Sequence, residues 1–231
     1  MNPESSINNL KKLLNKAGFD LFQTFSVQDY NRRVNAENRF HSDSPGAGIL
    51  VGNTRSIWPH FLGHLQLHDE WINRKNPFDD FVEFTLLECL RDLPIKHRIR
   101  YAHRPEPFHI SFQKLAQYSG LAFLSKSHLS VHPHYGSWFS LRAALVLEIG
   151  LQTTENELQE NPCSSCEHGC IPAFQVAMRK DSTWREWLKV RDSCPLGKNH
   201  RFSEQQIEYH YTKNQSVLRE LLSDQGSNIK S

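Results

Sequence analysis

The sequence predicts one α+β domain in which strands and helices are mixed first and helices alone follow. Its 231 residues are 38% hydrophobic and 23% charged, a composition that suits a globular chain with one large core. Up to about residue 150, apolar residues recur at both the strand and the helix period. After the polar stretch "TTENELQENP", only short helical segments follow. We therefore expect an α+β core at residues 1–155, with a cysteine-containing loop and helical cap at 156–231 packed on it.

The first elements are predicted by periodicity and by the residues that end them. Residues 5–18 have apolar side chains on one helical face and end at Gly18, which favours an amphipathic helix. Residues 20–27 alternate as a strand does, and a short helix is expected over 28–34. The apolar run at 46–54 ends in turn residues and is typical of a buried strand.

The next elements alternate in the same way. Two helices are expected at 57–71 and 77–93, and the second has two aspartates in its first turn, where the helix dipole favours acidic groups. A half-buried strand is predicted at 97–104 and a helix closed by Gly120 at 110–120. Further strand residues are expected within 121–132 and 138–149.

The last third of the chain has the spacing of short helices. "HRFSEQQ" places Ser203 as an N-cap with Gln206 in the reciprocal position of a capping box. The expected helices lie at 171–180, 183–191, 203–212 and 214–223.

Charge and hydropathy exclude several classes of function. The net charge is +2 and no basic run is present, so a nucleic-acid partner is not expected. No apolar stretch is long enough to cross a membrane, and no membrane partner is expected. The N-terminus lacks the apolar core of a secretory signal. A cytoplasmic location follows, where structural disulfides are rare.

Four of the five cysteines have the spacing of metal ligands. "CSSCEHGC" and the later "SCP" give C-x2-C-x3-C, then 23 residues, then Cys-Pro. Thiolates on one tight loop, closed by a ligand from a later turn, suit either one iron–sulfur cluster or Zn²⁺. Position 174 is Phe, so ligands for a second cluster are missing. Thiols without a metal remain the alternative. The candidate ligands are Cys163, Cys166, Cys170 and Cys194.

The segment "HPHYGSWFSLR" combines a glycine elbow with an arginine in an apolar strand. Gly136 admits the close approach of a ligand or of another strand, although the stretch by itself favours a β-bulge or turn with aromatic packing. Arg142 requires a partner if its strand is buried, and Glu148 or a ligand carboxylate would serve. On a regular strand, His132 and His134 would point the same way and could bind a metal together. The proline between them disturbs that geometry.

Three ordered segments resemble the intracellular cobalamin-processing family of the cblC type, whose members are cyanocobalamin reductases and alkylcobalamin dealkylases. They are "GFDLFQTFSVQDYN", "HPHYGSWFSLRAALVLEIGLQ" and "WREWLKVRDSCPLGKNHRFSEQQIEYHYT". The resemblance covers about residues 18–222 and is weak between 55 and 110. "GLAFLSKSHLSVHPHYGSWF" and the cysteine loop also resemble epoxyqueuosine reductase, which binds cobalamin and adds iron–sulfur clusters.

The resemblance implies a flavin-nitroreductase-like mixed sheet flanked by helices, with a cavity for cobalamin. It implies reductive removal of the upper axial ligand, with electrons from reduced FMN or FAD for cyanide and attack by glutathione for alkyl groups. Three arginines would hold the glutathione carboxylates, a role suited to the guanidinium fork: Arg142, Arg191 and Arg219. The implied cobalamin contacts are Tyr135, Gly136, Ser137, Trp138 and Trp187, together with Gln117 and Phe123, which replace a family histidine and tyrosine.

Three other functions stay open at this point. The first is a cobalamin-dependent iron–sulfur reductase of the epoxyqueuosine type, although no separate tRNA-binding region is present. The second is a carrier that binds cobalamin without chemistry, and the third is a zinc-stabilised domain with a vestigial cavity. The sequence leaves a homodimer and a cobalamin-delivery partner equally open.

Overall fold

The computed structural model describes residues 3–40, 46–104, 109–148, 160–167 and 169–227. A four-stranded sheet forms its centre, in the order β1-β2-β6-β3. The bounds of these strands are Leu21–Ser26 for β1, Ala47–Asn53 for β2, His97–Tyr101 for β3 and Ser140–Leu147 for β6. The fold is α+β, as predicted.

Each pairing in this sheet is antiparallel, whereas we expected a mixed sheet. The reason lies in the position of β6, which separates β2 from β3. Both neighbours run opposite to β6 and therefore parallel to each other, but they do not pair. The sheet would be mixed only if two parallel strands, such as β2 and β3, were paired with each other.

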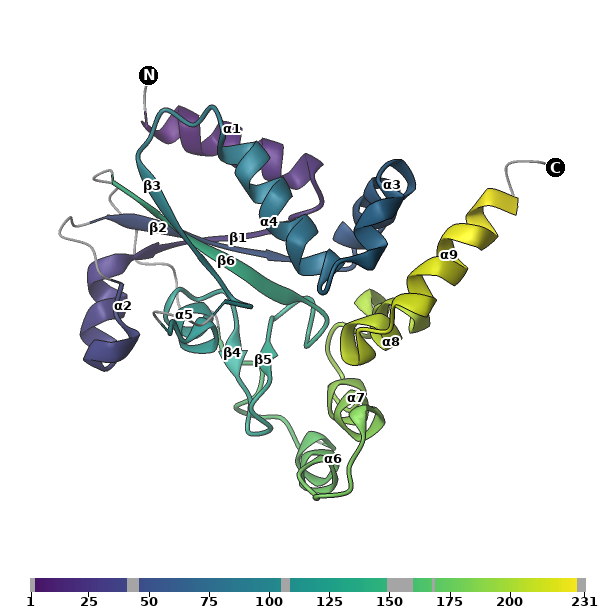
Figure 1. Cartoon of the computed structure of the whole chain (residues 1–231). Helices are drawn as coiled ribbons and strands as arrows, with labels where there is room; N and C mark the ends of the chain where they lie inside the picture. Colours follow the sequence, from purple (N-terminus) through teal and green to yellow (C-terminus); the bar gives the residue numbers. More distant parts are fainter. Residues whose placement is uncertain (1–2, 41–45, 105–108, 149–159, 168, 228–231) are drawn as a thin grey trace.

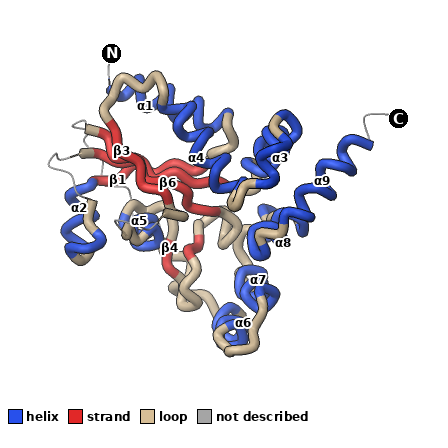
Figure 2. The backbone as a smooth tube through the Cα atoms, in the orientation of Figure 1, coloured by secondary structure: helices blue, strands red, loops and turns tan. Residues whose placement is uncertain are grey.

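Helices cover both faces of the sheet (Figure 1; Figure 2). Strand β6 explains why, because its side chains alternate between two apolar cores: Ala143, Leu145 and Leu147 belong to one, and Ala144 and Val146 to the other. A strand buried on both faces reads as a continuous apolar run, as β6 does.

The first core lies between the sheet and the helices of one face. These are α1 (Pro3–Lys16), α3 (Ile57–Leu67), α4 (Pro77–Leu90) and α9 (Gln215–Ser227), with the 3₁₀ helix η2 (Asp69–Asn73). Helices α2 (Val27–Arg33) and α5 (Phe112–Tyr118) cover the other face and complete the second core.

The remaining elements form a smaller layer beside the sheet. A short hairpin joins β4 (Phe123–Leu124) to β5 (Ser130–Val131), and α6 and α7 lie beside it, away from α1 and α4 (Figure 1). Trp138, Phe202 and Ile207 form a third apolar cluster there. The helices of this layer are α6 (Cys170–Ala177), α7 (Trp184–Asp192), α8 (Glu204–Thr212) and the 3₁₀ helix η3 (Lys198–His200).

Side-chain caps fix where α7 and α8 begin. Thr183 and Glu186 form a reciprocal capping box at the start of α7. At α8, the Ser203 hydroxyl accepts a hydrogen bond from the Gln206 amide at 3.2 Å, which confirms Ser203 as the N-cap.

Most predicted elements are present with boundaries shifted by a few residues. The clearest differences are that the helix expected over 57–71 ends at Leu67 and continues as η2, and that β3 ends at Tyr101. A further short 3₁₀ helix, η1, spans Ala36–Asn38. None of the helices in the described part of the chain combines the length and the apolar character needed to cross a bilayer.

Candidate functional site

Arg142 is the extra residue of a β-bulge. Along the β2–β6 ladder Val51 pairs with Ala143 and Gly52 with Leu141, so Arg142 has no partner on β2. A bulge lets one strand residue turn out of the regular alternation. This explains how an arginine is accommodated in a strand that is otherwise buried on both faces.

The guanidinium of Arg142 is held by neutral groups. Its Nε donates to Asn53 Oδ1 at 2.6 Å, and its Cζ lies 4.7 Å from the centre of the Phe78 ring. Burial lowers the pKa of Arg142 to about 10, while Asp79 raises it. Glu148, the internal partner considered above, instead pairs with Lys96 at 2.9 Å and with Arg98 at 3.8 Å.

Arg191 lies in the third apolar cluster. Its Nη2 donates to the Ser137 carbonyl at 2.7 Å, and its Cζ stands 4.4 Å from the Trp138 ring centre and 5.2 Å from that of Phe202. Burial lowers its pKa, and Tyr211 opposes this effect by charge and by a hydrogen bond. The charge of Arg191 also lowers the pKa of Arg142, so the two guanidiniums lie close enough to interact electrostatically.

His210 and Lys213 join these arginines from α8 and its end. Burial holds the pKa of His210 well below its usual value, and Arg142 adds to the effect. The His210 ring meets the Phe78 ring edge-on at 4.8 Å. Lys213 is exposed as a whole residue, yet packing around its amine lowers its pKa, with Asp79 opposing and Arg142 adding.

Arg219 makes a different contact. It lies on α9, where its Nη2 donates to Asn73 Oδ1 of η2 at 3.0 Å, and both residues are exposed. The structure therefore brings together Arg142 and Arg191 of the three predicted arginines. Lys213, which the sequence did not single out, is the third cation near Arg142.

Another backbone segment lies close to Gly136. A Cβ on Gly136 would lie 2.0 Å from the Leu196 carbonyl oxygen, and a Cβ on Gly197 would lie 2.1 Å from the Tyr135 carbonyl oxygen. Both glycines have positive φ, at 56° and 70°. The elbow and the loop after Cys194 are thus interlocked at two glycines. The predicted contact between Gly136 and cobalamin stays a prediction, and any such contact would use the side of Gly136 that faces away from Leu196.

The other residues predicted to contact cobalamin separate into two groups. Ser137 and Trp138 are buried, at 5% and 1% exposure, and they pack within the protein. Trp187 meets Phe174 edge-on at 6.0 Å between α7 and α6. The more accessible group comprises Gln117, which is exposed, and Phe123, Tyr135 and Trp187, which are half-buried.

The histidines of the elbow act on the backbone. His132 Nδ1 accepts hydrogen bonds from the amides of His134 and Tyr135, at 3.0 and 3.3 Å. Burial lowers the pKa of His132 to about 4, and the nearby His134 and His200 lower it further. His132 is therefore neutral at physiological pH and serves to shape the turn.

The four clustered cysteines line one small cavity of about 20 Å³. Burial raises the pKa of both the Cys163 and the Cys194 thiols, and neighbouring cysteines contribute to each shift. Among the residues that the structure describes, no group of three or more His, Cys, Asp or Glu side chains is already arranged to hold a metal ion. The predicted ligands are therefore brought together without forming a finished coordination sphere.

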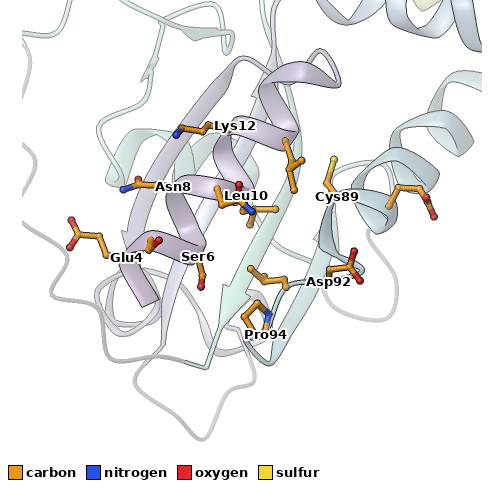
Figure 3. A pocket seen from close by; sticks show the side chains of 13 residues that line it. Glu4, Ser6, Asn8, Leu10, Lys12, Cys89, Asp92 and Pro94 are labelled. Carbon is orange, nitrogen blue, oxygen red and sulfur yellow. The ribbon is translucent and has the colours of Figure 1, made fainter. Parts of the chain in front are cut away.

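A separate cavity of about 710 Å³ lies between α1 and α4 (Figure 3). Glu4, Asn8 and Lys12 extend from α1 on one side, and Cys89 and Asp92 come from the other. The residues that line it lie outside the motif segments, and they include neither the elbow nor the two arginines. None of its lining residues is among the groups described around Arg142.

The segment that matches a known family contains the elbow, Arg142, Arg191 and the cysteine loop. Residues 125–221 match the methylmalonic aciduria and homocystinuria type C family. The resemblance to this family that the motifs predicted is thereby confirmed. A curated relative, "Cyanocobalamin reductase / alkylcobalamin dealkylase" of Danio rerio, is 23% identical over 234 residues, which span 90% of this chain and 89% of the relative.

Solved structures support the same fold. The C. elegans B12-trafficking protein CblC, described as a human MMACHC homologue, superposes with a TM-score of 0.73 at 18% identity and covers 94% of this chain and 96% of its own. Epoxyqueuosine reductase from Bacillus subtilis superposes with a TM-score of 0.54 at 13% identity, over 87% of this chain and 68% of the reductase. The chain therefore has the fold that these proteins share.

Sequence reasoning missed the residues that position the arginines. Asn53, Phe78 and His210 are far from Arg142 in the sequence, and no spacing rule connects them to it. One usable signal was present: Asn53 ends a fully buried strand, where a polar side chain requires a partner.

Proposed function

We propose that this protein binds cobalamin and removes its upper axial ligand reductively, as an enzyme of the cyanocobalamin reductase and alkylcobalamin dealkylase type. The whole-chain similarity to a relative with that name and the shared fold support this proposal. The observation that best supports the proposed chemistry is that two buried guanidiniums lie in the matched segment with neutral hydrogen-bond partners.

Such guanidiniums are available to an anionic ligand. Their fork geometry suits carboxylates, and a buried cation is stabilised strongly when an anion joins it. Glutathione carries two carboxylates and a thiol, and it is the proposed co-substrate. Arg142 and Arg191 would hold its carboxylates, and we assign the third cation to Lys213 because the charge of Arg142 acts on its amine.

The proposed dealkylation transfers an alkyl group to sulfur. The glutathione thiolate attacks the alkyl carbon, and the cobalt–carbon bond breaks with its electron pair left on cobalt, which yields a thioether and cob(I)alamin. The chain's part is to hold the thiol in line by its carboxylates, which lowers the entropic cost of the encounter. For cyanocobalamin, a reduced flavin supplies the electrons and cyanide leaves as the anion.

Binding and chemistry are tested separately by visible spectroscopy. Cyanocobalamin and methylcobalamin are each titrated into the purified protein, and the cobalamin spectrum is recorded before and after anaerobic addition of glutathione or a reduced flavin. We expect a spectral shift on binding and conversion to a reduced cobalamin on adding the reductant. A shift without conversion would make the protein a carrier, and no shift with either cobalamin would refute the proposal.

The thiol site is tested with three charge-removing variants. In Arg142→Gln the amide keeps a donor for Asn53 while the charge is lost. A hydrogen bond to a charged group contributes about 1.5–3 kcal/mol, so we expect the KM for glutathione to rise roughly 10- to 100-fold in Arg142→Gln and Arg191→Gln. Lys213→Gln should give a smaller rise, because its amine is more solvated. Initial rates over a glutathione series measure this.

Arg219→Gln is the matched control, because its guanidinium contacts Asn73 on the exposed side of α9. Its KM for glutathione should stay within about twofold of the unmodified protein, as for most surface changes. The cobalamin spectral shift should persist in all four variants. A rise in Arg219→Gln equal to that in Arg142→Gln would show that the third cation is Arg219 and not Lys213.

A further inference from the structure

Four thiols from two separate segments surround one small cavity beside the elbow. Cys163, Cys166 and Cys170 come from the loop that leads into α6, and Cys194 follows α7. The cavity holds about 20 Å³, and apolar side chains, among them Val131 and Val190, complete its wall. All five cysteines of the chain carry thiols, and Cys89 lies apart on α4.

The local structure holds these cysteines in place. The Cys163 amide donates to Asn161 Oδ1 at 2.9 Å, in a turn that Ser164 closes with two bonds to the Asn161 carbonyl. Cys170 is the first residue of α6 and is buried. Cys194 lies two residues before Leu196, whose carbonyl is locked against Gly136. The cluster is therefore a product of the fold and not only of close spacing in the sequence.

Two of the sulfurs lie beside backbone groups that the fold holds in place. The backbone amides of Leu196 and Ser137 adjoin the Cys194 sulfur, and amides in such positions support a metal-bound thiolate. Cys170 stands at the positive end of α6. Several thiolates in one apolar cavity repel one another, however, so a cation is needed to balance them.

We propose that Cys163, Cys166, Cys170 and Cys194 bind a single zinc ion in a structural site. Thiolate sulfur selects soft or borderline metals, and four cysteines satisfy the tetrahedral sphere that closed zinc sites have. The small volume of the cavity suits one ion. On binding, each thiol releases its proton to solvent and no electron is transferred.

Loading requires only local movement. The side chains do not yet form a finished sphere, so the thiols must turn toward the centre of the cavity. A cysteine has one side-chain torsion with three staggered positions, so such a turn leaves the backbone in place. Zinc imposes no directional preference of its own through its d electrons, which allows the protein to set the geometry.

The proposed ion would tie the layer of α6 and α7 to the elbow. Arg191 lies three residues before Cys194, and it donates to the Ser137 carbonyl. A zinc ion at the four cysteines would therefore hold the backbone that carries Arg191. The proposal does not depend on cobalamin chemistry, since it concerns binding of the metal alone.

Metal content and cobalt substitution test the site. The full-length protein is purified under reducing conditions, its zinc is measured by mass spectrometry, and a chelator-stripped sample is titrated with Co²⁺. We expect one equivalent of zinc, and for Co²⁺ the intense thiolate charge-transfer and tetrahedral absorption bands. Chelation should lower Tm by several degrees, because an ion that binds only the native state stabilises that state.

Single-cysteine variants localise the ion. Cys163→Ser and Cys194→Ser should lose the cobalt bands and stoichiometric zinc, while Cys89→Ser, a cysteine outside the cluster, should keep both. Circular dichroism verifies that each variant is folded, and a variant that fails to fold is replaced by Cys166→Ser, at a half-buried loop position.

Three results would overturn the proposal. The first is unmodified protein with far less than one equivalent of zinc and no cobalt bands. The second is binding that persists in the cysteine variants. The third is anaerobic reconstitution with iron and sulfide that gives a stable cluster which zinc does not displace. All three are read without cobalamin, so failure of the proposed enzymatic function would leave this test unaffected.

Discussion

At the scale of single residues, the most informative position is Arg142. An unpaired charge in a strand core is costly, so its presence demands a structural answer. The bulge between β2 and β6 turns it out of the regular alternation, and Asn53 and the Phe78 ring receive the guanidinium. Both of these partners are neutral, and the negative charge that acts on the guanidinium comes from Asp79.

His132 gives a prediction for stability as a function of pH. Its pKa in the folded protein is about 4, against about 6.5 when unfolded. Between these values the unfolded chain takes up a proton that the folded protein refuses, so the free energy of unfolding falls as pH drops from about 6.5 to 4. Allowing for solvent screening, we expect this residue to account for about 1–2 kcal/mol of that loss.

The His132→Asn variant measures the effect, because asparagine keeps an acceptor for the amides of His134 and Tyr135 but does not titrate. Urea unfolding at a series of pH values should show a shallower decline for this variant. His109→Asn, at an exposed position, should follow the unmodified protein. Identical pH profiles for His132→Asn and the unmodified protein would contradict the assignment.

At the scale of elements, the contact between two loops organises the site. The elbow after β5 and the loop between α7 and α8 meet at Gly136 and Gly197, each of which lacks room for a Cβ. This contact places Cys194 against the other cysteines and Arg191 against Trp138. Two features that appear unrelated in the sequence are therefore built by one backbone contact.

Substitution at these glycines should destabilise the protein strongly. Gly136→Ala and Gly197→Ala each combine an unfavourable left-handed φ, which costs about 1–2 kcal/mol, with a clash against a carbonyl oxygen. We expect a loss of about 3 kcal/mol or more in the free energy of unfolding, measured by urea denaturation.

Gly63→Ala provides the control for the glycine substitutions. Gly63 lies inside α3, where an added Cβ meets nothing within 4 Å. Alanine has the higher helix propensity, so this variant should be more stable by up to about 1 kcal/mol. If all three alanine variants were equally stable, the interlock would have no energetic role.

At the scale of the whole molecule, residues from both sides of position 155 share apolar clusters. Trp138 and Ile207, from either side of that division, share the third apolar cluster. Val217 and Leu218 of α9 pack into the first core, together with α1 and α4. The later part of the chain thus contributes to the main body as well as to the layer that carries α6 and α7.

The local physics of the sequence was sufficient for most elements of this protein. Period, capping residues and glycines predicted the helices and strands, since these depend on contacts only a few residues apart. The ordered motifs also predicted the family resemblance and identified Arg142 and Arg191. The cysteine spacing correctly indicated that these four residues lie close together.

Tertiary structure alone decided what those residues meet. Pairing register created the bulge at Arg142, and the insertion of β6 between β2 and β3 made the sheet antiparallel. The packing of the elements also placed Leu196 against Gly136, Lys213 near Arg142 and Arg219 in contact with Asn73. These contacts join residues tens of positions apart, and their geometry depends on the packing of whole elements, which no local pattern in the sequence encodes.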